Sequence, residues 1–399
     1  MRPSNIFPTC FFALLSVLRT ASSHTPEHGS PNAKTPFPIS TTTLSPQLFH
    51  KYDSQRIKAT YGPYTVPSMH TDNGMISFGG STVPPPCTSC LITYLHAGLE
   101  YADGTTADAH NGMWLHHTVW VNLRRNDSTC PSPKRGDRFF ASGNERTPVD
   151  LTASGTTKAG YEIREGDVIA MGGELMNMRS EEREVRLTMV FEFIPSVPKE
   201  FKKVKGYWLD VGGCRNSDVE AKEDQAFEYS SQTFKSEDRG IVVFTASHLH
   251  DGGTHTEIRK QGKVVCDSEA AYGKEGDERH IEALSACTDV GRTKPGDEWS
   301  ITAYYNTSMH KPMRNMDGSL EPVMGISLVY VAVDGKNGGH KKLKIVLGVG
   351  VAVLSAVLVV MWANLNGRDW LLRKREGVVL GEDTKSRWSL LGERYRDDI

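Results

Sequence analysis

Short runs rich in β-branched and aromatic residues alternate with Gly, Asp and Asn between residue 57 and about residue 335. Few segments show a sustained helical period, so the pattern predicts strands rather than helices. The clearest runs are 113–123 (MWLHHTVWVNL), 185–194 (VRLTMVFEFI), 240–250 (GIVVFTASHLH), 298–306 (EWSITAYYN) and 324–333 (MGISLVYVAV). About 280 residues of this kind are more than one sandwich requires. We therefore expect an all-β fold of two tandem antiparallel β-sandwiches of jelly-roll type, at 57–198 and 199–336.

A weak internal repeat in the sequence also favours two domains. Gly166-Asp167 and Gly296-Asp297 are each followed by a short strand, an asparagine, a loop and a strongly apolar strand. A duplicated sandwich explains this repeat, and chance similarity between two β segments is the alternative.

The N-terminal segment resembles a secretory signal. An apolar stretch at 6–18 follows Arg2 and precedes Ala21-Ser22-Ser23, which predicts a signal peptide over 1–23, with a retained anchor as the alternative. Residues 24–56 are rich in Pro, Ser and Thr, which predicts a flexible segment.

The C-terminal region contains an uncharged stretch of about 19 residues at 345–363, enough to span a bilayer as a helix. It has no polar face that would suit a buried core helix, so we expect a transmembrane helix at 343–363. Together with the signal, this predicts a type I single-pass protein of the secretory pathway or plasma membrane, with the lipid bilayer as partner and a cytosolic tail at 364–399. Small residues at 348, 352 and 356 would allow a weak homodimer through this helix.

Composition narrows the class of protein. Charged residues make up 24% of the chain and the net charge is −2, which excludes a disordered polyelectrolyte and gives no support to a nucleic-acid partner. Neither the G-x-S-x-G motif of serine hydrolases nor the GxxxxGK[ST] phosphate loop occurs.

The cysteines fit an oxidising compartment. Cys10 lies in the predicted signal, and an even set of six remains, which predicts three disulfides. We expect the last two to pair with each other, and the CxxC formed by the first two to be a structural disulfide rather than a zinc or redox site. The six are Cys87, Cys90, Cys130, Cys214, Cys266 and Cys287. Asn126 and Asn306 begin N-glycosylation sequons.

Two histidine motifs carry the candidate chemistry. His248 and His250 form an H-x-H, and alternate residues of a strand point to one face, so both imidazoles can reach one metal ion. His116 and His117 are adjacent and would reach one ion only through a bulge or through different ring nitrogens. A polar surface near a turn is the alternative for the first pair, and a core position for His117 is the alternative for the second.

A pair of adjacent histidines in one β-domain and an H-x-H in the next resembles the copper type II, ascorbate-dependent monooxygenases, typified by the peptidylglycine α-hydroxylating enzyme and dopamine β-monooxygenase. WLHHTVWVNL and HLHDGGTH look closer still to uncharacterised secreted fungal proteins and plant nodulin-like relatives of these enzymes. The resemblance implies two β-sandwich domains, each with one copper ion, facing each other across a solvent-filled cleft. It implies that His116 and His117 hold the electron-transfer copper, and that His248, His250 and Met324 hold the oxygen-activating copper.

The sequence departs from that family at the first copper. The family has a third histidine downstream within the first domain, and residues 118–247 of this chain contain none. His96 or His110 could substitute from upstream. Met324 has competitors nearby in Met309, Met313 and Met316.

The sequence therefore predicts a membrane-anchored glycoprotein that binds one or two copper ions. The resemblance implies a monooxygenase that hydroxylates a C–H bond of a small-molecule or peptide substrate with O2 and ascorbate. The alternative is a non-enzymatic cell-surface or metal-binding protein that retains the fold with a degenerate first copper site. No catalytic residue beyond the metal ligands can be named from the sequence.

Overall fold

The computed structural model describes residues 38–130, 136–273 and 280–335, together with Met361. Within these residues, strands form three sheets and the only helices of the β-rich part are three single turns, η1 (His50–Tyr52), η2 (Asp72–Gly74) and η3 (Ala109–Asn111). The expectation of an all-β fold is confirmed, and the packing of the sheets is that of β-sandwiches.

The largest sheet has ten strands and runs through both the first half of the fold (residues 40–194) and the second half (residues 202–333). Its order is β1 (Ser40–Leu44), β2 (Gln55–Val66), β10 (Arg183–Ile194), β4 (Cys90–Glu100), β8 (Ala159–Ile163), β11 (Lys202–Asp210), β20 (Gly325–Val333), β14 (Gly240–Leu249) and β18 (Arg292–Thr293), with β7 (Val149–Asp150) paired to β4. The halves join where β8 and β11 pair in parallel, Lys202 with Ala159 and Lys203 with Gly160.

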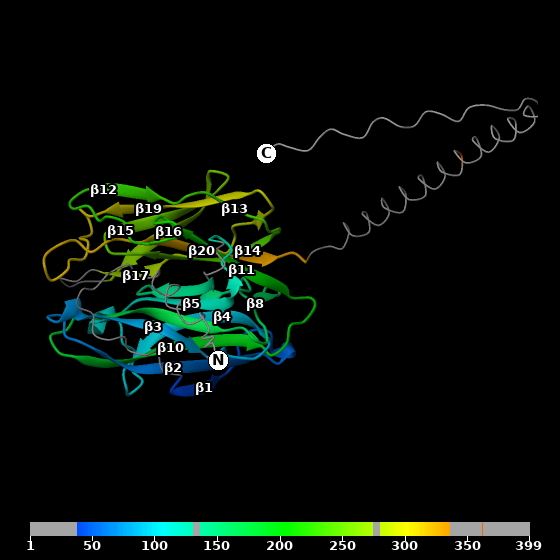
Figure 1. Ribbon diagram of the computed structural model, residues 1–399, viewed down its shortest axis with the longest axis horizontal. Helices are drawn as coiled ribbons and strands as arrows, with labels where there is room; N and C mark the ends of the chain where they lie inside the picture. The colour runs from blue at the N-terminus through cyan, green and yellow to red at the C-terminus, as the bar shows by residue number, and fades with distance from the viewer. Residues whose placement is uncertain (1–37, 131–135, 274–279, 336–360, 362–399) are drawn as a thin grey trace, which may run out of the picture. The chain divides into compact units, whose positions relative to one another are not determined.

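Two smaller sheets complete the fold. The four-stranded sheet belongs to the first half, in the order β3 (Met75–Val83), β9 (Ile169–Asn177), β5 (Met113–Asn126) and β6 (Gly136–Gly143). The six-stranded sheet belongs to the second half, in the order β12 (Ala226–Ser230), β19 (Glu298–Asn306), β15 (Gly253–Lys260), β16 (Lys263–Tyr272) and β17 (Ile281–Leu284), with β13 (Phe234–Lys235) paired to β19. In Figure 1, β1, β2 and β10 lie at one side of the stack, β5 in its middle, and β12 and β19 at the other side.

Strands β5 and β20 are buried on both faces. Every residue of 113–122 in β5 and of 325–332 in β20 is buried. On β20, Ile326, Leu328 and Tyr330 pack into the apolar core that includes the first half, whereas Val329 and Val331 pack against the six-stranded sheet. A strand covered on both faces carries apolar residues on both, which is why these two segments are apolar at neighbouring positions rather than at alternate ones.

Three disulfides are present, as the cysteine count predicts. Cys266 pairs with Cys287 and Cys87 pairs with Cys90, as expected for both. The third joins Cys130, which follows β5 in the first half, to Cys214, which follows β11 in the second half.

Part of the segment predicted to be flexible is ordered. Residues 40–44, within 24–56, form β1, which pairs along its whole length with β2. The run Ser-Thr-Thr-Thr-Leu is almost entirely exposed, but its three threonines are β-branched and suit an edge strand. The Ser- and Thr-rich composition that indicated flexibility is here that of a strand exposed at a sheet edge.

The predicted signal peptide at 1–23 and the tail at 364–399 lie outside the described residues, and so does the span at 343–363 apart from Met361. Within the part of the chain that the structure describes, no helix has the length and apolar character needed to cross a membrane. Asn126 is exposed and Asn306 is half-buried at strand ends, and glycosylation of both stays a prediction.

Asp137 gives the fold a pH dependence. It is 8% exposed on β6 and accepts a hydrogen bond of 2.9 Å from the hydroxyl of Tyr161. Burial, aided by the negative charge of Asp127, outweighs that hydrogen bond and raises the pKa of Asp137 to about 6. This pKa is above that of an aspartate in the unfolded chain, so protonation of Asp137 favours the folded state. That contribution to stability is present at low pH and is lost as the pH rises through about 6.

Asp137→Asn should therefore stabilise the protein at pH 7.5 by up to about 3 kcal/mol, since it removes the buried charge. The gain should shrink as the pH falls from 6 toward 4, where the wild-type carboxyl is protonated. The measurement is the difference in melting temperature between variant and wild type across this range. A difference that is constant with pH would contradict the assignment.

Replacing Cys130 and Cys214 together by Ser should lower the free energy of unfolding by about 4 kcal/mol, because this disulfide closes a long loop. The matched control replaces Cys87 and Cys90, which close a very short loop, and should cost about 2 kcal/mol. Denaturant unfolding of the two double variants measures both. Equal losses would show that loop closure does not determine the effect.

Candidate metal centre

A β-bulge places His116 and His117 together. In the pairing of β5 with β9, Leu115 faces Leu175 and His117 faces Glu174, so that His116 is the extra residue. Adjacent side chains on a regular strand point to opposite faces, and a bulge re-aims one of them. The two Nδ1 atoms lie 3.0 Å apart, so of the two alternatives that the sequence left open the structure has the bulge, and both histidines present the same ring nitrogen.

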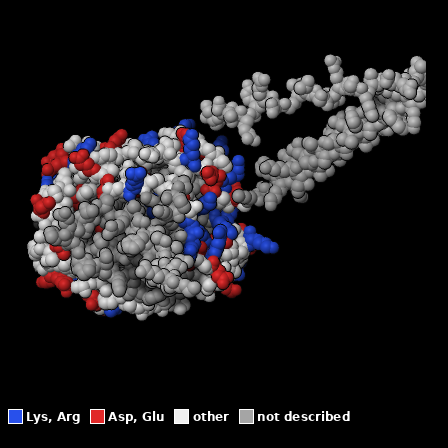
Figure 2. Space-filling model, in the orientation of Figure 1, with Lys and Arg blue, Asp and Glu red and all other residues white. Residues whose placement is uncertain are grey.

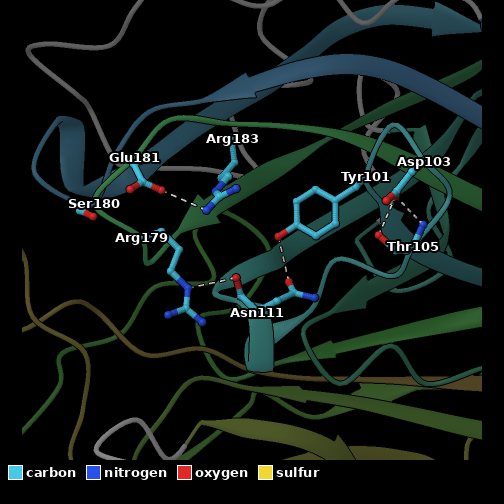
Figure 3. A pocket seen from close by; sticks show the side chains of 8 residues that line it. All are labelled: Tyr101, Asp103, Thr105, Asn111, Arg179, Ser180, Glu181 and Arg183. Atoms are coloured by element: carbon cyan, nitrogen blue, oxygen red, sulfur yellow. Dashed lines mark hydrogen bonds and ion pairs between the residues drawn. The ribbon is translucent and has the colours of Figure 1, made fainter.

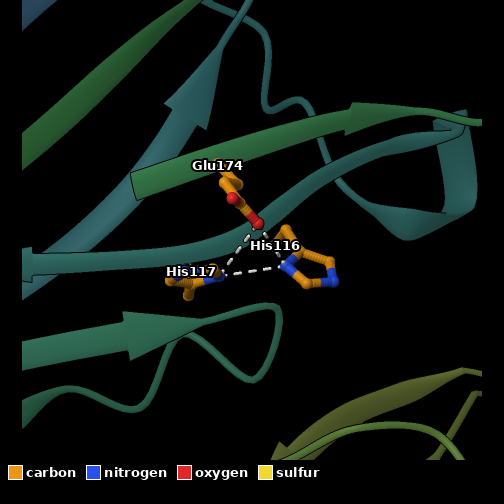
Figure 4. Close-up of side chains that lie close together, drawn as sticks. All are labelled: His116, His117 and Glu174. Carbon is orange, nitrogen blue, oxygen red and sulfur yellow. Dashed lines mark hydrogen bonds and ion pairs between the residues drawn. The ribbon is translucent and has the colours of Figure 1, made fainter. Parts of the chain in front are cut away.

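Glu174 completes a group of three ligand atoms (Figure 4). Its Oε2 lies 3.5 Å from Nδ1 of His116 and 3.7 Å from Nδ1 of His117. All three side chains are buried, and their ligand atoms lie within 4.8 Å of one another. This group can hold one metal ion through two nitrogens and one oxygen. Neither His96 nor His110 belongs to it.

His248 and His250 present free nitrogens toward the interior. The Nδ1 of His248 lies 3.1 Å from Oε2 of Glu145, and the Nδ1 of His250 lies 2.8 Å from the carbonyl oxygen of Pro322. Because both partners are acceptors, each Nδ1 carries a hydrogen, and in the neutral imidazole each Nε2 then carries the lone pair. Within the described residues both Nε2 atoms are buried and have no hydrogen-bond partner.

Met324 lies beside this pair in register. Leu249 pairs with Gly325, so the next position along the antiparallel ladder places Met324 across from His250. Met324 is 4% exposed and belongs to the apolar core. Its role as a metal ligand stays a prediction. Of its competitors, Met309 and Met316 are 70% and 61% exposed.

The two histidine pairs form one cluster. The rings of His116 and His250 lie 4.9 Å apart between centroids, and those of His248 and His250 lie 5.3 Å apart. The resemblance implied two sites facing each other across a solvent-filled cleft. The imidazoles in this structure are in contact, and His116 and His117 are 6% and 7% exposed.

Carboxylates set the charge of the cluster. Burial alone would lower the pKa of His116, but its hydrogen bond with Glu321 and the charges of Glu321 and Glu174 outweigh burial and raise the pKa to about 9. Burial, together with the charge on His116, lowers the pKa of His117 and of His250. His117 and His250 are therefore neutral, the form that binds metal, whereas a copper ion bound to His116 would displace the proton on its Nδ1.

Several residues of the cluster carry no sequence signal. Glu174, Glu321 and Glu145 are distant in sequence from the histidine motifs, and isolated glutamates are common. His280 is similar: its Nδ1 lies 2.5 Å from Oδ2 of Asp251, its ring packs edge-on against Trp114, and its buried Nε2 has no hydrogen-bond partner among the described residues. Asp251 alone could have been found, because it directly follows the H-x-H.

A separate pocket opens on the surface of the first half (Figure 3). It is lined by Tyr101, Asp103, Thr105, Asn111, Arg179, Ser180, Glu181 and Arg183. The hydroxyl of Tyr101 donates to Oδ1 of Asn111, and Arg183 pairs with Glu181. None of the predicted metal ligands lines it.

On the face shown in Figure 2, acidic side chains gather mainly on one side and basic side chains on the other.

Comparison with known proteins gives two similar curated relatives. A protein of Phoma sp. named a probable copper-dependent oxygenase is 42% identical over 277 residues, which cover 69% of this chain and 72% of the relative. A probable copper-dependent oxygenase of Cochliobolus lunatus is 36% identical over 311 residues, which cover 73% of this chain and 99% of the relative.

Two further comparisons assign neither a family nor a fold to the chain. No family model matches the chain. A solved structure of PNGF-II aligns with 69% of this chain and 66% of its own at 9% identity, with a TM-score of 0.33, which is too low to establish a common fold.

Gly143→Ala should weaken copper binding without unfolding the protein. A Cβ at this position would lie 2.6 Å from Nδ1 of His248 and 2.6 Å from Oε2 of Glu145, so their hydrogen bond would have to move. We expect about a tenfold loss of affinity, the lower end for a disturbed partner of a metal ligand. Copper titration against a competing chelator measures it.

The control is Gly206→Ala on β11, where the nearest atoms to the new Cβ would lie at 3.7 Å and 3.9 Å. It should leave copper affinity unchanged. Equal copper affinity in the two variants would show that Gly143 does not affect the metal site.

Proposed function

The chain belongs to the family of the probable copper-dependent oxygenases, and from this premise we propose that its histidine cluster holds copper and oxidises an organic substrate with O2. The observation that carries the proposal is the pair of buried Nε2 atoms on His248 and His250. A buried polar atom without a partner is costly, and a neutral imidazole whose other nitrogen is tied to an oxygen is the usual form of a metal ligand.

We assign two groups of ligands. His116 and His117 would hold one copper through Nδ1, with Glu174 in place of the third histidine of the copper type II monooxygenases that the sequence resembles. His248 and His250 would hold the other through Nε2, with Met324 as the expected thioether ligand. Imidazole suits copper in both oxidation states and a thioether favours Cu(I), so the donor set fits a copper that cycles between them. Copper, when bound, supplies one-electron and O2 chemistry.

The remaining residues of the cluster orient ligands and exclude water. Glu145 and the Pro322 carbonyl fix the orientation of the histidines on the second-half side. Glu321, 3% exposed, lies 3.2 Å from Nε2 of His116, whose N–H can donate to the carboxylate and leave Nδ1 facing the first copper position. Burial of His116 and His117, and of the Nε2 atoms of His248 and His250, keeps bulk water from the ligand atoms.

The finer form of the proposal is a monooxygenase that uses ascorbate. In such a reaction one oxygen atom of O2 enters a substrate C–H bond as hydroxyl, and the other is reduced to water with two electrons from ascorbate. The H-H and H-x-H motifs, on separate halves of the chain, support this form. The substrate would be a small molecule or a peptide.

We also propose that the described part lies on the outer side of a membrane, held by residues 343–363. The sequence patterns at both termini support this placement. The three disulfides are compatible with it, because disulfides persist in oxidising compartments such as the secretory pathway.

Two measurements test the function: the copper content of the purified protein, and O2 consumption recorded with an oxygen electrode. Wild-type protein should bind two copper ions per chain and consume O2 when ascorbate is supplied. His248→Ala should bind at most one copper ion and lose O2 consumption above that of free copper, because the second ligand group is incomplete.

The matched control is His255→Ala, a half-buried histidine stacked on Tyr304 outside the cluster, which should behave as wild type. Copper binding without O2 consumption would favour the non-enzymatic metal-binding protein. Absence of copper binding in the wild type would overturn both.

A further inference from the structure

Each half of the chain supplies a carboxylate to a histidine of the other half. Glu145 follows β6 in the first half and contacts His248, which is on β14 in the second half. Glu321 precedes β20 in the second half and contacts His116, which is on β5 in the first half. The contacts run in opposite directions between the same two halves.

The segment that carries Glu145 touches both histidine pairs. In the ladder between β5 and β6, Gly143 faces His117, and two residues later Glu145 reaches His248. The Oε1 of Glu145 also accepts the backbone N–H of Gly143 at 2.9 Å, which fixes the carboxylate relative to the strand. Three consecutive residues, 143–145, therefore connect the backbone at His117 to the side chain of His248.

The segment that carries Glu321 does the same for the other two histidines. The side chain of Glu321 lies 3.2 Å from Nε2 of His116, and the carbonyl of the next residue, Pro322, accepts from Nδ1 of His250 at 2.8 Å. Two neighbouring residues thus orient one histidine from each pair. Both carboxylates are almost completely buried, with side chains 4% exposed, so solvent does not screen the contacts.

We propose that Glu145 and Glu321 are positioning residues that couple the two histidine pairs, so that copper binding at one pair increases the affinity of the other. The inference rests on the proposed copper function. A first copper ion fixes the imidazoles of its own pair, and the crossing carboxylates then hold the second pair in its binding orientation. The second ion no longer has to order those side chains, which produces positive cooperativity, and the coupling is reciprocal.

Native mass spectrometry of the full chain counts copper ions on each molecule and tests the coupling directly. At half saturation with Cu(I), wild-type protein should contain mainly molecules with no copper or two copper ions. Glu145→Ala and Glu321→Ala should each accumulate one-copper molecules, and each should lose 10- to 100-fold in copper affinity against a competing chelator.

Two further variants separate positioning from stability. Glu145→Gln keeps an oxygen that can accept from Nδ1 of His248, so it should restore most of the two-copper population. It also serves where the alanine variant does not fold. Glu192→Gln removes a buried carboxylate that pairs with Arg56 away from the cluster, and it should destabilise the fold but keep the wild-type distribution of copper.

The failures of the two proposals are distinguishable. Wild-type protein that binds two copper ions with a statistical share of one-copper molecules would overturn the coupling and leave the copper function intact. Wild-type protein that never binds copper would overturn both. A one-copper population in Glu192→Gln as large as in Glu145→Ala would show that general destabilisation explains the effect, and would also overturn the coupling.

Discussion

The burial of β5 on both faces is the constraint on which the rest of the structure depends. Met113–Asn122 leave no face for solvent, so any polar side chain in this stretch must find its partners inside the protein. His116, His117 and Asn122 are such residues. The bulge at His116 turns both imidazoles toward the same acidic side chains. The carboxylates that His116 contacts are Glu174 on β9 and Glu321 in the segment before β20. A buried strand thus becomes the position where the two halves meet.

The chemistry of the cluster follows from how its hydrogen bonds are shared. On His248 and His250 an oxygen acceptor occupies Nδ1 and leaves Nε2 without a partner, whereas on His116 the carboxylate of Glu321 occupies Nε2 and leaves Nδ1 facing His117 and Glu174. The two pairs therefore present different ring nitrogens. Hydrogen bonds are stronger in a low-dielectric interior, so the partner of each histidine determines which of its ring nitrogens is left without one.

The architecture explains why the pairs are in contact. The parallel pairing of β8 with β11 makes one sheet continuous through both halves, and the Cys130–Cys214 disulfide joins them a second time. These connections bring β14 and the β19–β20 connection against β5 and β6. Gly143 leaves room at this junction for the contact between His248 and Glu145, which a larger side chain there would displace.

The sequence by itself determined the β class, the three disulfides and the two histidine motifs. These are local properties: period, cysteine parity and adjacent residue types are readable over a few positions. It did not identify β1, because exposed threonines on an edge strand look like a flexible segment. Nor could it show that Glu174, Glu145 and Glu321 complete the cluster, or that His116 contacts His250. Single glutamates have no periodic signal, and only the three-dimensional packing of strands far apart in the sequence decides which buried carboxylate meets which imidazole.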